Sequence, residues 1–108
     1  MTNRLLACAT LSFALMAGRA FAQNPGDAAK GKEVYEQCAV CHSADTVEKK
    51  MGPGLKGLYK KAKLANGQKP SDASILAFIN KGKGAMPAFA DVLSADEKAQ
   101  LLVYLKTL

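Results

Sequence analysis

Residues 38–42 read Cys-Ala-Val-Cys-His, and this pentapeptide decides the fold of the 108-residue chain. Two thiols three positions apart on a helical turn can each add across one of the two vinyl groups of haem. The histidine that follows then lies under the iron and supplies an axial nitrogen ligand. Cys-x-x-Cys-His is the sequence signal for c-type haem attachment. The sequence therefore predicts one covalently attached haem, with thioethers at Cys38 and Cys41 and iron ligation by His42.

The first 22 residues have the pattern of a secretory signal peptide. Arg4 gives a positive n-region, residues 5–17 are an apolar stretch of 13, and residues 20–22 (Ala-Phe-Ala) form a small-residue cleavage site. Thirteen residues are too few to span a bilayer, which takes ~20, so an uncleaved anchor is the less favoured alternative. We predict export to the periplasm, cleavage after Ala22, no stable membrane insertion and one mature domain over residues 23–108.

Charge and composition limit the class of partner. The mature part keeps 13 basic and nine acidic residues, a net charge of +4. Tryptophan is absent, and no basic stripe is interleaved with aromatic residues, so a nucleic-acid partner is not predicted. A domain this small buries a modest core and usually needs a staple or a cofactor. A covalently held haem would be both, because its apolar faces extend the core.

Apolar residues at helical spacing predict an all-α domain. After a cap at Asp27, one helical face carries Gly31, Val34, Tyr35 and Cys38. A glycine inside a helix costs ~1 kcal/mol relative to alanine. Its place on the apolar face indicates that another helix crosses there at close range, whereas a tolerated surface glycine is the alternative.

The rest of the chain alternates between loops and helices. Residues 43–57 are loop-like, because Met51-Gly52-Pro53-Gly54 cannot continue a helix. A short helix is expected from about Leu55 to Leu64, and Asn66-Gly67 marks a turn. A helix capped by Ser71 or Asp72 is expected to run to about Lys81, with Ile75, Phe78 and Ile79 facing inward, and to end at Gly82. The last helix starts at a capping box, Ser94 to Glu97, and its apolar face consists of Leu101, Tyr104, Leu105 and Leu108.

Low-spin haem in an electron carrier needs a second axial ligand, and the mature chain has no second histidine. Met51 and Met86 are the candidates. Met86 stands in a glycine-rich loop directly after a helix, which can bring a thioether over the ring, and we predict that Met86 binds the iron. Met51 lies only nine residues after His42 and is interpreted as core filler. Ligation by neither methionine is the remaining possibility.

Metal ligation by histidine also calls for a hydrogen-bond acceptor at its other ring nitrogen, which orients the ring. The carbonyl of Pro53 is the candidate acceptor for the Nδ1–H of His42. The alternative is a turn proline with a solvated carbonyl.

Four segments in this order resemble the motifs of class I c-type cytochromes: residues 38–42, residues 52–58 (Gly-Pro-Gly-Leu-Lys-Gly-Leu), residues 84–89 (Gly-Ala-Met-Pro-Ala-Phe) and residues 101–105 (Leu-Leu-Val-Tyr-Leu). The chain is most similar to the small soluble carriers of bacterial respiratory chains. The Met86 segment also resembles photosynthetic carriers that can replace plastocyanin.

The resemblance implies a cytochrome c fold, in which three main helices and a short helix wrap round one covalently bound haem c. It also implies His42/Met86 ligation, thioethers at Cys38 and Cys41, a hydrogen bond from His42 to Pro53, and a crossing of the first and last helices. One departure is the absence of the tryptophan that often binds a haem propionate. Its role would fall to Tyr59, Asn66, Gln68 or a lysine.

With both axial positions filled, no open site for substrate remains, so we predict a monomeric one-electron carrier and not an enzyme. The expected pocket walls are Leu55, Leu58, Tyr59, Phe78, Ile79 and Phe89. A membrane oxidase or reductase is the expected partner, and a positive rim for its acidic site would consist of Lys49, Lys50, Lys56, Lys60, Lys61, Lys63, Lys81 and Lys83. The alternative is a haem protein with an open axial position, acting as a gas sensor or peroxidase.

Overall fold

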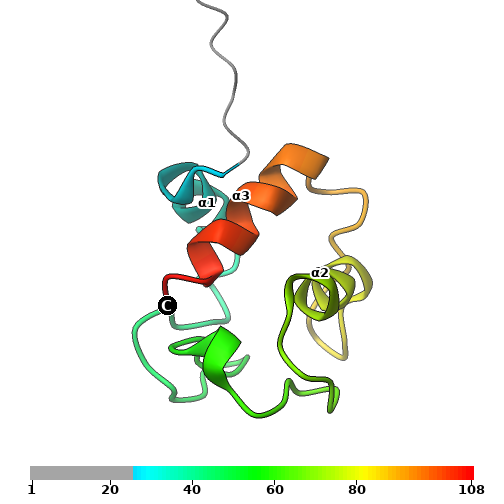
Figure 1. Cartoon of the computed structure of the whole chain (residues 1–108). Coiled ribbons are helices and arrows are strands. Elements are labelled where there is room, and N and C mark those ends of the chain that lie inside the picture. The colour runs from blue at the N-terminus through cyan, green and yellow to red at the C-terminus, as the bar shows by residue number, and fades with distance from the viewer. Residues whose placement is uncertain (1–25) are drawn as a thin grey trace, which may run out of the picture.

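The computed structural model describes residues 26–108, which form three α-helices, one short 3₁₀-helix and, in this part of the chain, no β-strand (Figure 1). The elements are α1 (Ala28–Tyr35), η1 (Leu58–Lys60), α2 (Asp72–Lys81) and α3 (Ala95–Leu105). The predicted all-α class is therefore confirmed. The expected signal peptide lies outside the described residues. Between residues 26 and 108, no helix is long and apolar enough to cross a membrane.

The helix starts are set by side-chain caps that the sequence predicted. The Oδ1 atom of Asp27 accepts a hydrogen bond of 2.8 Å from the backbone N–H of Ala29 at the start of α1. Ser94 and Glu97 form the capping box of α3, with reciprocal hydrogen bonds of 3.1 Å. Ser71, rather than Asp72, caps α2, and Gly82 ends that helix with a φ of +68°. Each cap satisfies backbone N–H groups that have no partner inside the helix.

The first and last helices cross at Gly31, as the sequence predicted. A Cβ atom at Gly31 would overlap the backbone carbonyl oxygen of Gln100 and lie 2.7 Å from the Cβ of Tyr104. Only glycine lets the two backbones approach this closely. Beside the crossing, the rings of Tyr35 and Tyr104 pack with their centroids 5.2 Å apart. The crossing joins the two ends of the domain.

The hydrophobic core lies under this crossing. Leu101 of α3 is its most buried side chain, with 1 % of its surface exposed. The other buried apolar residues are Val34, Tyr35, Leu58, Ile75, Ile79, Leu93, Leu102 and Leu105. They come from all four helices and from the segment before α3, so this small core connects every element.

Two predicted helix boundaries are wrong. The short helix expected over residues 55–64 is confined to the three residues of η1. It is interrupted because Gly57 has a left-handed φ of +68° and Lys61 is extended, with a ψ of 150°. Similarly, α1 ends at Tyr35, so Cys38 lies in the turns that follow the helix rather than within it.

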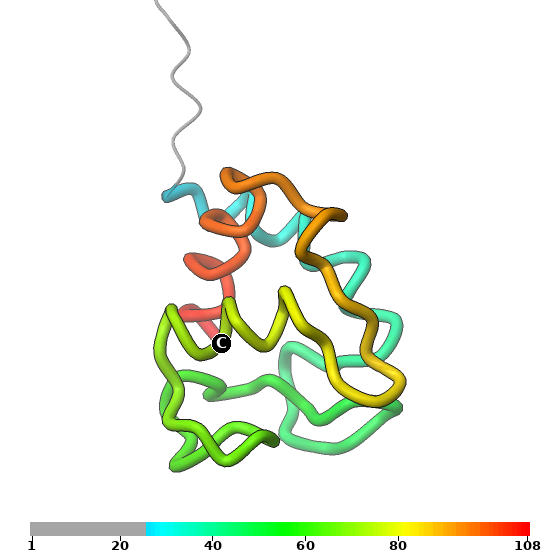
Figure 2. Tube along the Cα trace, turned by 90° about the vertical axis from the view of Figure 1, so that its right-hand side faces the viewer, coloured from blue at the N-terminus to red at the C-terminus, as the bar shows by residue number. Residues whose placement is uncertain are grey.

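The segments around the core are arranged on two sides. In Figure 1, the loop over residues 43–57 lies on the left and α2 with the loop over residues 82–89 on the right, below the α1–α3 crossing. Residues 58–70 pass along the bottom between them. Figure 2, turned by 90°, again places the crossing above and residues 58–70 below. The two loops therefore approach the centre of the domain from opposite sides.

Candidate haem site

The Cys-x-x-Cys-His segment forms a tight turn directly after α1. The backbone N–H groups of Cys41 and His42 both donate to the carbonyl of Cys38, at 3.1 and 2.9 Å. Both thiols are free and half-buried. Burial raises the pKa of Cys38, and the neighbouring Cys41 adds to the effect. The segment therefore presents two reduced sulfurs and an imidazole within one turn.

The ring of His42 is oriented by a backbone acceptor. Its Nδ1 lies 2.8 Å from the carbonyl oxygen of Pro53, the atom that the sequence indicated. A carbonyl only accepts hydrogen bonds, so Nδ1 carries the donated proton, and in the neutral ring Nε2 then has a free lone pair. A neutral imidazole with this tautomer has the form that binds a metal through Nε2.

A further contact holds the haem-binding turn, residues 38–42, in place. The hydroxyl of Tyr35 donates to the backbone carbonyl of His42 at 2.9 Å. Burial, followed by the charges of Tyr104, Cys38 and Asp45, raises the pKa of Tyr35 to about 12. The phenol therefore stays protonated and continues to donate across the neutral pH range, and it connects α1 to the ligand segment.

Gly52 allows the loop to close over the imidazole. Its backbone N–H donates to the carbonyl of Cys41 at 2.8 Å. A Cβ atom at Gly52 would overlap Cε1 of His42 and lie 2.7 Å from Nδ1 and 2.9 Å from Nε2. Sequence reasoning treated Gly52 as a helix breaker and as part of the motif over residues 52–58, and it predicted no contact with His42. Its position directly before Pro53 was the available signal for this second role.

Met86 lies in a small hairpin between α2 and the segment that leads to α3. Lys83 and Met86 exchange backbone hydrogen bonds of 3.1 and 3.0 Å, and Gly84 takes a φ of +58° at the turn. The N–H of Phe89 then bonds to the carbonyl of Ile79 at 3.0 Å. Met86 is partly buried and packs against the core. Its thioether is thus held on a rigid loop.

Met51 is in a different environment, and its interpretation as core filler is wrong. Its side chain is 70 % exposed, and its Sδ lies 3.9 Å from Sγ of Cys41. The reason is a tight local turn, in which the N–H of Lys50 bonds to the carbonyl of Gly52 at 3.0 Å. This turn holds the Met51 side chain outside the core.

The predicted pocket walls are distributed around the core. Leu58 and Ile79 are buried, and the partly buried walls that pack against them are Leu55, Tyr59 and Phe89. The hydroxyl of Tyr59 donates to Oδ1 of Asp72 at 2.8 Å. Burial and this hydrogen bond raise the pKa of the phenol. Tyr59 therefore links η1 to α2.

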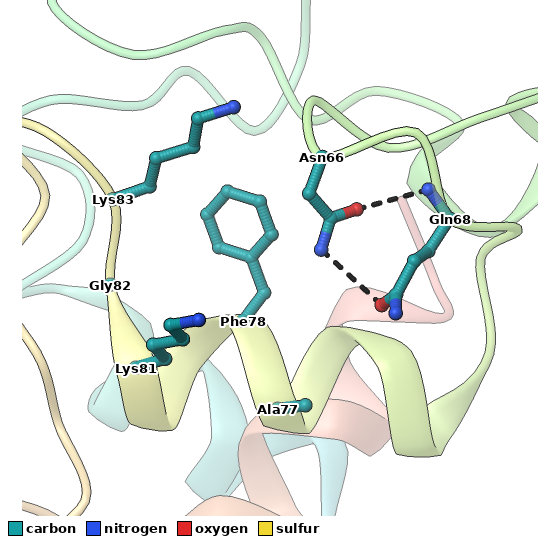
Figure 3. A pocket seen from close by; sticks show the side chains of 7 residues that line it. All are labelled: Asn66, Gln68, Ala77, Phe78, Lys81, Gly82 and Lys83. Atoms are coloured by element: carbon teal, nitrogen blue, oxygen red, sulfur yellow. Dashed lines mark hydrogen bonds between the residues drawn. The ribbon is translucent and has the colours of Figure 1, made fainter.

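Phe78, the remaining predicted wall, points into an open cavity of about 520 Å³ beside the last turn of α2 (Figure 3). The opposite wall consists of Asn66 and Gln68, which hydrogen-bond to each other twice, at 3.1 and 3.3 Å. The rest of the lining is Ala77, Lys81, Gly82 and Lys83. The Nζ atom of Lys83 donates to the carbonyl of Ala65 at 3.3 Å across the opening. The cavity has an apolar floor and a rim of amide and ammonium donors.

These residues fit a covalently attached haem. Two free thiols, an imidazole with Nε2 available and a partly buried thioether are the donor set of a c-type haem with two axial ligands. Gly52 supplies the space that the oriented imidazole needs. Half-buried Leu55, Tyr59 and Phe89 are apolar walls that a flat apolar ring would cover. Within residues 26–108, no group of three His, Cys, Asp or Glu residues could hold a metal ion.

Known cytochromes are similar to this chain. Residues 26–105 match the family described as cytochrome c oxidase, cbb3-type, subunit III. The chain is 40 % identical over 79 residues to cytochrome c6 of Leptolyngbya boryana, covering 72 % of this chain and 88 % of the relative. It is 29 % identical to cytochrome c2 iso-1 of Magnetospirillum molischianum, over 68 % of this chain and 91 % of that protein.

A solved structure is similar as well. Cytochrome c6 from the diatom Phaeodactylum tricornutum superposes with a TM-score of 0.59 and 30 % sequence identity. The superposition covers 75 % of this chain and 92 % of the diatom chain. The likeness therefore extends over nearly the whole length of that protein.

Proposed function

The chain belongs to the class I c-type cytochromes, electron carriers with covalently bound haem c, and on this premise we propose that it is a periplasmic one-electron carrier with His42/Met86 ligation. Bound haem supplies the iron, whose change between Fe(III) and Fe(II) carries the electron. The thioethers would form at Cys38 and Cys41. As a carrier and not an enzyme, the protein needs redox partners on both sides of the transfer.

The observation that carries the proposal is the hydrogen bond of 2.8 Å between Nδ1 of His42 and the carbonyl of Pro53. It orients the ring and raises the basicity of Nε2 toward iron. Gly52 and the Tyr35 hydroxyl fix the same segment from two other directions. Held in this way, His42 would keep its orientation toward the iron in both oxidation states, which would favour fast electron transfer.

The surroundings of the two methionines support Met86 as the second ligand. Met86 packs against the core, and its loop, residues 82–89, lies on the other side of the domain from the loop over residues 43–57 (Figure 1). Met51 is exposed and lies beside the Cys41 sulfur, on the same segment as His42. Met86 would supply a thioether as the second iron ligand, which favours Fe(II) and would raise the reduction potential.

The cavity in Figure 3 is suited to the carboxylate edge of the haem. Tyr59 already donates its proton to Asp72, which leaves the side-chain amides of Asn66 and Gln68 and the ammonium groups of Lys81 and Lys83 as donors at this end of the domain. Gly82 lines the cavity, and a Cβ atom at this position would overlap the carbonyl oxygen of Met86. The cavity therefore adjoins the loop that carries the proposed ligand.

Charge distribution supports docking through lysines. Nine of the 13 lysines lie between Lys49 and Lys83, a stretch with a single acid, Asp72. Asp72 is itself paired with Lys106 at 2.9 Å. An acidic site on a membrane oxidase or reductase would be attracted to this positively charged stretch of the chain, because a uniform charge accelerates association with an oppositely charged partner.

Visible spectroscopy of the purified protein tests the ligand assignment. We expect low-spin bands on reduction and a weak far-red sulfur-to-iron band in the ferric protein. Met86→Ala should abolish the far-red band, whereas the matched variant Met51→Ala should keep it. If Met86→Ala left the band intact, the assignment would be overturned. A wild-type protein that holds haem without this band would favour the gas sensor or peroxidase with an open axial position.

The docking proposal has a separate test. The rate of electron exchange with an acidic redox protein should fall as the ionic strength rises, because salt screens the attraction between exposed charges. A rate that does not depend on salt would contradict docking through lysines and leave the haem assignment untouched.

A further inference from the structure

Three polar side chains from different parts of the chain meet at the start of α2. The Nζ atom of Lys106, which follows α3, lies 2.9 Å from Oδ2 of Asp72, the first residue of α2. The hydroxyl of Tyr59 in η1 donates to Oδ1 of the same carboxylate at 2.8 Å. The ammonium group of Lys106 also lies 5.7 Å from the centre of the Tyr59 ring. Each of the three side chains therefore contacts the other two.

This cluster is a polar link between α2 and two distant segments. The part of the chain that the structure describes forms two ion pairs. One, between Lys30 and Glu33 at 3.6 Å, lies within α1. The other, between Asp72 and Lys106, joins residues 34 positions apart. The hydrogen bonds from Lys106 and Tyr59 lower the pKa of Asp72, so the carboxylate is charged at neutral pH and holds both partners.

The other end of α2 carries the loop with the proposed iron ligand Met86. The helix ends at Gly82, and the hairpin that contains Met86 follows directly. The chain then returns to the helix, because the N–H of Phe89 donates to the carbonyl of Ile79 at 3.0 Å. Met86 therefore lies in a loop whose two ends are both attached to the last turn of α2. A shift of the helix would move this loop with it.

Apolar packing fixes the position of α2 less precisely than polar contacts do. Ile75 and Ile79 of α2 are buried in the core, but hydrophobic contact is non-directional, so it restrains sliding of the helix along its axis only weakly. Hydrogen bonds depend on distance and angle, and the two at Asp72 fix the start of the helix relative to η1 and the end of α3.

We propose that Asp72 is a positioning residue for Met86: it ties the start of α2 to Lys106 and Tyr59, and thereby holds the loop at the other end of the helix where the thioether binds iron. This inference rests on the proposed His42/Met86 ligation. Without the tie, α2 would shift more readily, and the thioether would leave the iron more often. The fold as a whole would lose little, because an exposed ion pair contributes little to stability.

Imidazole binding to the ferric, haem-loaded protein tests this role. Added imidazole can bind the iron only while Met86 is dissociated, so its apparent affinity rises with the fraction of protein in that state. We expect Asp72→Asn and Lys106→Met each to raise this affinity about threefold, as the loss of an exposed pair allows. Glu33→Gln, which removes an exposed carboxylate from the ion pair within α1, is the matched control and should have no effect.

The two variants change the net charge in opposite directions, which separates positioning from long-range electrostatics. The tie predicts a higher affinity for imidazole in both, and in the double variant no more than in either single one. Opposite changes in Asp72→Asn and Lys106→Met would overturn the proposal, and so would the affinity of Glu33→Gln in both. Lys106→Met leaves α2 unchanged and carries the test by itself if Asp72→Asn does not fold.

Two further measurements keep this inference apart from the fold and from the carrier function. The midpoint of urea denaturation should stay close to that of the wild-type protein, and a large fall would overturn the proposal, because the cluster would then hold the whole domain. A far-red band in the wild-type protein with no change in imidazole affinity would reject only the role of Asp72. A wild-type protein without that band would contradict the ligation on which the inference rests.

Discussion

Gly31 and Gly52 both permit a contact that a methyl group would block, but the two regions use it differently. At Gly31, a helix backbone meets another helix backbone, and the obstructing atoms are the carbonyl group of Gln100 and the Cβ of Tyr104. At Gly52, a loop meets the ring of His42. The first contact is made between elements that are rigid by themselves, whereas the second shapes the surroundings of a single side chain.

The two regions should therefore control different properties: the α1–α3 crossing controls stability, and the loop around His42 controls the orientation of the iron ligand. The α1–α3 crossing contains the most buried side chain and joins the two ends of the domain, so damage there should lower the free energy of unfolding. The loop around His42 contains no regular helix and is held by a few hydrogen bonds. Damage there should first change the orientation of the imidazole, and the properties of iron that depend on it.

The largest expected effect is on the crossing. Leu101→Ala removes a side chain that is 1 % exposed and should lower the free energy of unfolding by about 3 kcal/mol, through lost burial and the cavity left behind. Urea denaturation of the haem-loaded protein measures this loss. Val92→Ala, at a side chain that is 61 % exposed, is the control and should change the midpoint little. Equal losses in both variants would contradict the assignment of the core.

Gly31→Ala should have the next largest effect and should lower the free energy of unfolding by about 2 kcal/mol. Overpacking usually costs about 1–3 kcal/mol, and the better helix propensity of alanine returns up to ~1 kcal/mol. Thermal unfolding gives the loss, and Lys32→Ala, an exposed neighbour on α1, is the matched control. The visible spectrum should stay unchanged in both. A stabilised Gly31→Ala protein would show that the helices can separate without penalty.

Gly52→Ala should have the opposite balance of effects from Gly31→Ala, with a clear change in the haem properties and a small change in stability. We expect a shifted midpoint potential and an altered ferric spectrum, because the new methyl group displaces the His42 ring, with a smaller loss of stability than Gly31→Ala. Gly54→Ala is the control, since its Cβ would meet backbone atoms of residues 46–48 and not the imidazole. The same spectral change in both variants would mean that the loop acts as a whole and that Gly52 has no specific role.

The smallest effect on stability is expected at Asp72, whose polar contacts at the surface link η1, α2 and α3. Asp72 accepts from Lys106 at 2.9 Å and from Tyr59 at 2.8 Å, and these two hydrogen bonds hold its pKa below the usual range. A lowered folded-state pKa stabilises the fold above the unfolded pKa, and this contribution is lost as the pH falls through the folded one. Asp72→Asn should cost less than about 1 kcal/mol at neutral pH, because the pair is exposed.

Acid titration of stability checks this assignment. The difference between the wild-type protein and Asp72→Asn should be present at neutral pH and should shrink in acid. Asp91→Asn, at an exposed acid outside the cluster, is the control. A difference that grows in acid would have the wrong sign and would exclude the ion pair as its source.

The helix caps were predicted correctly from the sequence, because each cap depends on residues close together in the chain. The caps at Asp27, Ser71 and Ser94 depend on side chains that bond to backbone groups two or three residues away. Gly31 on an apolar face indicated a close crossing, because it is the one residue of α1 without a side chain. The helix over residues 55–64 was overestimated, since apolar spacing alone does not reveal that Gly57 adopts a positive φ.

The two methionines illustrate what the sequence leaves undecided. Met86 was distinguished by its glycine-rich loop, and the fold packs it against the core. Met51 was interpreted as core filler, yet it is exposed beside Cys41. Hydrophobicity predicts burial only on average. The direction of one side chain in a loop depends on backbone turns that no periodic pattern encodes.

The sequence alone determined the helical class, the helix starts, the family and the cofactor, because these follow from spacings within a few residues and from four short motifs in a fixed order. Tertiary structure decided what those motifs face. It placed the Pro53 carbonyl on Nδ1 of His42, engaged Tyr59 with Asp72, and left Met51 at the surface on the Cys41 sulfur. Such contacts join residues ten or more positions apart through loops, and only the closed chain brings them within reach.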